Sequence, residues 1–171
     1  MTSKAAKSAP SVSPAPGKAG RGENSRAAQL RAANINPRTG LATDYLNHFN
    51  EAVMLLEMIP DMPECAEAFL GWQPVSYREH FSASHFRARA LAIEAYDSAD
   101  THVRVEFDNI TAAMTSILTA EGTAMRETDQ DKTRATLAEQ ATGWVKPLVS
   151  LAGGIINGGN EADVETIMMT R

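Results

Sequence analysis

The stretch THVRVEFDNITAAMTSILTAEGTAMRE, residues 101–127, decides the fold class of this chain. Its large apolar side chains recur every three or four positions, which places them on one side of an α-helix and leaves the other side polar. Asp100 supplies a cap just before the stretch, and Asp129 and Asp131 mark the start of the next helix. The spacing predicts a long amphipathic helix, with an apolar stripe made of Val103, Phe107, Ile110, Met114, Ile117, Leu118 and Met125.

The segments upstream of this stretch carry the same helical period. A first helix is predicted over 41–59, where the run ends before a proline, and a short second helix over 61–70. Ser76 and Glu79 form a capping box, in which the Ser76 hydroxyl and the Glu79 carboxylate accept hydrogen bonds from each other's backbone N–H groups. A third main helix is therefore predicted from Ser76 to about residue 96.

Downstream, apolar side chains predict another long helix over 131–156. Pro147 lies inside it, so we expect a kink near 143–146, because an interior proline removes a backbone donor and clashes one turn back. Asn160 is a cap for a last short helix. Since no segment alternates as a strand would, the sequence predicts an all-α, up-and-down helical bundle of four main helices plus short ones, with residues 39–171 as a single domain.

Residues 1–38 are predicted to be a disordered basic tail, apart from a transient turn or two of helix over 23–33. The tail is rich in Ala, Ser, Pro and Gly and buries too little apolar surface to offset the entropy of ordering. Residues 1–40 hold 7 basic and 1 acidic residue (7 − 1 = +6), and the remainder holds 9 and 20 (9 − 20 = −11). We expect the tail to solubilise the chain near its own acidic surface. Nucleic acid or an anionic membrane surface is the less favoured partner, because the tail lacks aromatic stacking groups.

The compartment is predicted from the cysteine content and from the apolar runs. Cys65 is the only cysteine, so an intrachain disulfide is excluded and a reducing, cytoplasmic location is favoured. The N-terminal residues lack the apolar run of a secretion signal. The longest apolar stretches fall short of the ~20 residues that a membrane-spanning helix needs, so we expect no transmembrane segment.

Histidines supply the most specific candidate site. The Glu-x-x-His pattern of bundles that bind two metal ions is absent, since no histidine has a glutamate three positions earlier. His48, His80 and His85 nevertheless lie within or beside the apolar faces of the helices predicted over 41–59 and 76–96. Antiparallel packing of these helices would gather two or three imidazoles, which suit a divalent transition metal such as zinc, iron or nickel. The alternative is that each histidine is a boundary residue bonded to a carbonyl or a carboxylate.

Other chemistry has little support in the sequence. Cys65 is flanked by Glu64 and Glu67, which oppose a thiolate, and no phosphate-binding loop or dinucleotide fingerprint is present. The segment 144–156 is apolar almost all round, which favours either self-association or a central place in the bundle. We therefore predict a non-catalytic interaction or regulatory protein that associates with itself or with a protein partner. The alternative hypothesis is a metal-binding bundle that uses His48, His80 and His85.

Overall fold

The computed structural model describes residues 18–159, with side chains from residue 25 onward. Within this range the regular structure is helical, and the only extended pairing is an isolated bridge between Ile35 and Ala42. The predicted all-α class is thus confirmed. The elements are α1 (Lys18–Ala32), the 3-10 turn η1 (Thr43–Tyr45), α2 (Leu46–Met58), α3 (Cys65–Leu70), α4 (Tyr77–Ala83), α5 (Arg89–Asp97), α6 (Thr101–Arg126) and α7 (Asp131–Ile156).

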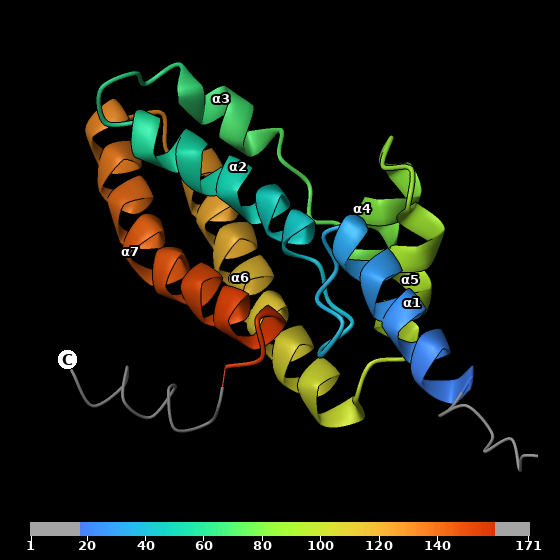
Figure 1. Ribbon diagram of the computed structural model, residues 1–171. Coiled ribbons are helices and arrows are strands. Elements are labelled where there is room, and N and C mark those ends of the chain that lie inside the picture. The colour runs from blue at the N-terminus through green and yellow to red at the C-terminus, as the bar shows by residue number, and fades with distance from the viewer. Residues whose placement is uncertain (1–17, 160–171) are drawn as a thin grey trace, which may run out of the picture.

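The two longest helices form an antiparallel hairpin (Figure 1). α6 and α7 have 26 residues each, α2 packs against α7, and α3 packs against α2 and α6. The predicted start of α6 is confirmed, because the Asp100 carboxylate accepts from the backbone N–H groups of His102 (2.9 Å) and Val103 (3.3 Å). The apolar stripe of α6 supplies much of the core, with Phe107, Met114 and Met125 fully buried.

α1, α4 and α5 form a second group beside this layer (Figure 1). Exposed ion pairs join them: Arg26 of α1 contacts Glu94 of α5 at 2.7 Å, and Arg78 of α4 pairs with Asp97 of α5. The two groups meet at Phe107, whose ring centroid lies 5.9 Å from that of Tyr77 on α4.

The prediction of one continuous helix from Ser76 to about residue 96 is wrong. The capping box forms as expected, with Glu79 N donating to Ser76 Oγ at 3.1 Å, but α4 ends at Ala83 and Ser84 is extended. The Ser84 hydroxyl donates to the Phe81 carbonyl (2.9 Å) and accepts from the Phe86 N–H (3.3 Å). These local bonds replace the helical ladder, so α4 and α5 are separate helices.

The predicted disorder does not extend to residues 25–38. Leu30 and Ile35 are buried, and the Thr39 hydroxyl donates to the carbonyl of Ile156, the last residue of α7, at 2.6 Å. Gly40 has a φ of +72°, and a Cβ there would lie 2.7 Å from the Ala95 carbonyl oxygen, so glycine permits this close approach to α5. The predictions for residues 1–17 and for a last helix after Asn160 lie outside the described residues.

α7 continues through Pro147 without a break. In the part of the chain that the structure describes, no helix is long and apolar enough to span a membrane.

Candidate functional site

Two of the three predicted histidines lie together between the two helix groups. The ring centroids of His48 on α2 and His80 on α4 are 6.5 Å apart, and both rings already have partners. His48 Nε2 accepts from the backbone N–H of Val75 at 3.1 Å, and His80 Nε2 lies 2.9 Å from Asp44 Oδ2. Both histidines thus match the boundary arrangement, with one nitrogen bonded to a backbone or carboxylate group.

His85 does not join this pair. It is exposed in the connection between α4 and α5, where it lines an apolar groove together with Ala32 of α1 and the next residue, Ala33. Because α4 ends at Ala83, the chain carries His85 away from the face that holds His80. Among the described residues, no group of three or more His, Cys, Asp or Glu side chains is placed to hold a metal ion.

His48 is held in its neutral form. Burial lowers its pKa to about 4, and the neighbouring His80 contributes in the same direction. The indole of Trp72 stacks on the His48 ring with centroids 4.5 Å apart, and its Nε1 donates to the His48 carbonyl at 3.0 Å. His48 thus holds residues 72–75 in place through these contacts. Because its Nε2 lone pair accepts a hydrogen bond and its pKa is low, His48 does not take up a proton near neutral pH.

Two buried tyrosines complete this connection. Tyr45 donates its hydroxyl to the Val75 carbonyl at 2.7 Å, and Tyr77 accepts from the Ala42 N–H at 2.9 Å. Burial raises the pKa of both hydroxyls above the usual range, so neither forms a phenolate at neutral pH. The hydrogen bonds of Tyr45, Tyr77 and His48 together link η1 and the start of α2 to the segment at the start of α4.

Sequence analysis missed a second polar arrangement, which lines a cavity of about 490 Å³. The Tyr96 hydroxyl donates to both carboxylate oxygens of Asp108, at 2.7 and 2.9 Å, and the Tyr96 ring stacks on Tyr77 at 4.5 Å. Burial and this bond raise the pKa of Tyr96 to about 12. Arg78 and Arg104 lie 5.6 and 5.8 Å from the Tyr96 ring centroid. No local signal links Tyr96 to Asp108, because they lie on different helices.

Two large apolar side chains of the hairpin are exposed within the described residues, Trp144 of α7 and Val105 of α6. Lys146 pairs with Glu57 of α2 at 2.7 Å, and Gly153 faces Leu46 of α2, so these positions mark the side of α7 that packs on α2. Residues two positions away on a helix point about 200° apart. Trp144 therefore points away from α2, and it is 55% exposed.

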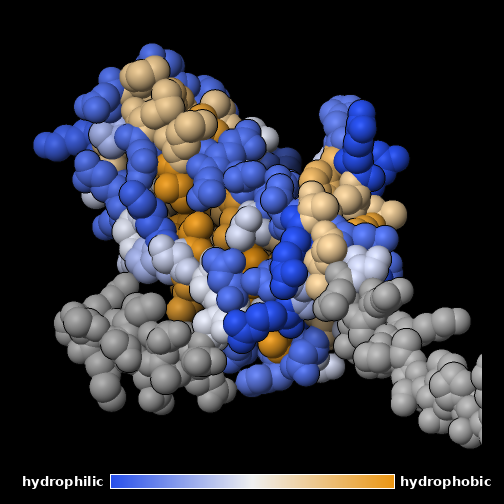
Figure 2. Space-filling view, in the orientation of Figure 1, coloured by the Kyte–Doolittle hydropathy of each residue, from blue (hydrophilic) through white to orange (hydrophobic). Residues whose placement is uncertain are grey.

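Apolar side chains also reach the surface at the end of α2, where hydrophobic atoms gather at the upper left of Figure 2. Met54 of α2 is 55% exposed, and Met62, which follows α2 in the chain, is 40% exposed. Met54 thus belongs to a different helix from Trp144.

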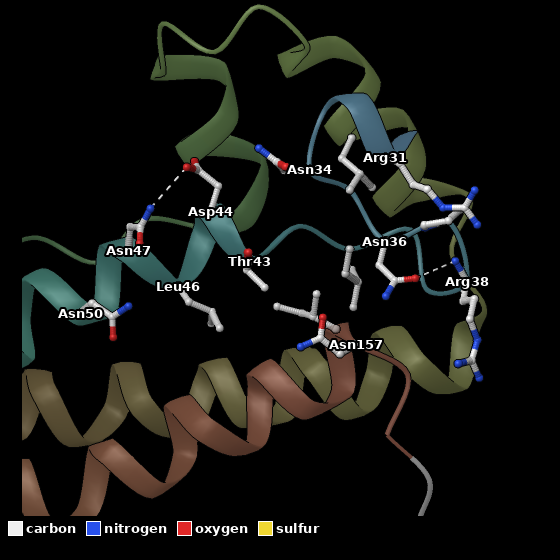
Figure 3. Close-up of a pocket in the computed structure, with 14 residues that line it drawn as sticks. Arg31, Asn34, Asn36, Arg38, Thr43, Asp44, Leu46, Asn47, Asn50 and Asn157 are labelled. Atoms are coloured by element: carbon white, nitrogen blue, oxygen red, sulfur yellow. Dashed lines mark hydrogen bonds between the residues drawn. The ribbon is translucent and has the colours of Figure 1, made fainter. Parts of the chain in front are cut away.

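A polar groove of about 700 Å³ lies where the end of α1, the start of α2 and the end of α7 meet (Figure 3). We call it the arginine groove. Buried Ile35, Leu41 and Ile156 are among its lining residues. Its polar lining consists of Arg31, Asn34, Asn36, Arg38, Thr43, Asp44, Asn47, Asn50 and Asn157. The basic segment that was predicted to be a free tail thus forms one wall of this groove.

Comparison of the chain with protein-family models, with curated proteins and with solved structures finds no match in any of the three.

Proposed function

We propose that this protein is a non-catalytic interaction protein that associates with a second copy of itself through the outer face of the α6–α7 hairpin. The observation that carries the proposal is Trp144, a large apolar side chain that is 55% exposed in the middle of a long helix. The face comprises Leu137, Trp144, Leu148 and Leu151 of α7 with Ile110, Ala113, Ile117, Ala120 and Ala124 of α6.

The spacing of these residues supports a continuous apolar face. On α7 they recur at intervals of seven, four and three residues, and on α6 at three and four, so each set lies along one side of its helix. Leu148, Ile110 and Ile117 are half-buried at the edge of the core. All nine positions are uncharged, which suits a surface that loses water on association.

A second copy fits the size of this face. A helix of 26 residues is about 39 Å long, and two adjacent helices are roughly 20 Å wide. The hairpin thus offers roughly 800 Å², which is what each partner contributes to a typical stable interface. Two hairpins packed by a two-fold axis would form a four-helix arrangement around the two Trp144 side chains.

Sedimentation equilibrium between about 1 and 100 µM tests the proposal. We expect the wild type to be a dimer and Trp144→Glu to be a monomer, because a charge at the centre of the face would have to be desolvated. Met54→Glu is the matched control, since Met54 has the same exposed fraction on another helix, and it should remain dimeric. Circular dichroism checks that both variants are folded.

A wild type that stays monomeric up to about 100 µM would contradict self-association. A dimer that tolerates Trp144→Glu but is lost in Met54→Glu would contradict the assigned face.

A further inference from the structure

Two positively charged side chains on the wall of the arginine groove favour binding of an anionic group. Arg31 of α1 and Arg38 of the following loop are exposed on its wall, and neither guanidinium has an ion pair within residues 25–159. Asp44 is the only acidic lining residue. Its carboxylate is already engaged, by His80 Nε2 at 2.9 Å and by the Asn47 side-chain amide at 3.3 Å. Exposed guanidiniums that have no ion pair among the described residues favour carboxylates, to which each can donate two parallel hydrogen bonds.

The asparagine side chains of the arginine groove favour a peptide over a simple inorganic anion as the ligand. The side chains of Asn34, Asn50 and Asn157 are exposed and make no hydrogen bond to another residue of the described part of the chain, so they are available to a ligand. Each amide offers both a donor and an acceptor, which is also what each residue of an extended peptide presents. An inorganic phosphate at neutral pH is mainly an acceptor, so it would leave the amide carbonyls unmatched.

The wall formed by η1 and α2 indicates how many residues of a bound segment would lie along it. Figure 3 shows Arg31 and Arg38 at one end and Asn47 and Asn50 at the other. Along η1 and α2, the helical rise from Thr43 to Asn50 is about 10 Å. Roughly three residues of extended peptide, at about 3.3 Å each, span that distance.

We propose that the arginine groove binds a short extended peptide segment of a partner protein, with an acidic side chain at the Arg31–Arg38 end and its backbone paired with the asparagine amides. The side chains of Ile35, Leu41 and Ile156 are buried beneath this lining, so the contacts that the groove offers to such a segment are polar. This groove lies apart from the outer face of the hairpin, so the proposal does not depend on self-association.

Fluorescence anisotropy with the full chain tests the groove. The probe is a fluorescein-labelled Gly-Glu-Asp-Glu-Gly amide, and the comparison peptide replaces its acidic residues by Gln and Asn. We expect the acidic peptide to bind and the neutral one to bind at least tenfold more weakly. Arg31→Gln should weaken binding of the acidic peptide by about tenfold, or about 1.4 kcal/mol, because it removes a charge-assisted contact.

Arg87→Gln is the control, because Arg87 is an exposed arginine in the α4–α5 connection and the charge change is the same. It should leave peptide binding unchanged, and so should Trp144→Glu, which separates this proposal from the dimer. The proposal is overturned if the neutral peptide binds equally well, if Arg87→Gln weakens binding as much as Arg31→Gln, or if inorganic phosphate displaces the probe as effectively as unlabelled acidic peptide.

Discussion

The α6–α7 hairpin and the group formed by α1, α4 and α5 are held together in different ways. The hairpin has two helices of 26 residues, and its core is a stripe of buried apolar side chains. α4 and α5 have only 7 and 9 residues, and besides burying side chains such as Phe81 and Ala92 they make specific polar contacts, such as the hydrogen bond between Tyr96 and Asp108. Apolar burial thus stabilises both parts, whereas hydrogen-bond geometry has the larger share in setting the shape of the second group.

Met114→Ala should have the largest effect, because it creates a cavity in the centre of the hairpin core. Met114 is completely buried, so the free energy of unfolding should fall by about 2–5 kcal/mol in denaturant titration. Met54→Ala, at a position 55% exposed, should change it by less than about 0.5 kcal/mol. Equal losses from the two variants would show that this core is not packed as described.

Tyr77→Phe should cost about 1–3 kcal/mol, because it leaves the buried N–H of Ala42 without its hydrogen-bond partner. The loss should be local, so hydrogen exchange at Ala42 should speed up more than exchange in α6. Tyr96→Phe removes the same atom from a half-buried ring and should cost less. If both variants lower stability equally and exchange rises throughout the hairpin, the two groups do not differ as proposed.

The same contrast explains how much of the fold could be predicted from the sequence. α6 and α7 were predicted because a stripe at helical spacing is a local signal, as are the caps at Asp100 and Ser76. The break at Ser84 was missed because two side-chain hydrogen bonds outweigh the helical pattern there. Packing of residues 25–40 was missed because it depends on distant contacts, such as that of Thr39 with Ile156.

The candidate site, too, could be predicted only where its residues depend on local sequence signals. His48 and His80 lie close together, with ring centroids 6.5 Å apart, but α4 packs mainly against α5 and η1, so the antiparallel helix packing from which their proximity was predicted is not what brings them together. His85 was misplaced because its position depended on the helix continuing through Ser84. The arginine groove could not be predicted, because it draws on α1, α2 and α7 and on a segment whose composition is typical of disorder.

Acid should lower the free energy of unfolding by disrupting the contacts of His48 with residues 72–75. The pKa of His48 is lowered from 6.5 to about 4, so the folded state binds its proton less tightly than the unfolded chain does. Stability is therefore fully present above pH 6.5 and is lost as the pH falls towards 4, by on the order of 1–2 kcal/mol after allowance for solvent screening. His48→Gln, whose carbonyl can still accept from Val75, should lose less over that range. A His48 ring that titrates near 6.5 by NMR would contradict this prediction.

Glu121 is a polar exception within the apolar hairpin. Its side chain is buried, its Oε2 has no hydrogen-bond partner in the described structure, and burial raises its pKa. The folded state thus binds this proton more tightly, and stability falls as the pH rises from the unfolded pKa through the folded one. Glu121→Met should raise the free energy of unfolding by about 1 kcal/mol at pH 7, with the gain vanishing below about pH 4.5. A pH-independent gain would assign the effect to packing instead.

Arg26→Gln should have the smallest effect, although it removes the only ion pair between α1 and α5 within the described residues. Arg26 and Glu94 have exposed side-chain fractions of 45% and 57%, and exposed pairs contribute about 0–1 kcal/mol. We therefore expect a loss below about 0.5 kcal/mol in denaturant titration at low salt and none at 1 M salt. Leu30→Ala, at a buried position on the same helix, should cost more than Arg26→Gln at either salt concentration. The reverse order would mean that charge holds α1 in place, and the wall of the arginine groove would then loosen as salt increases.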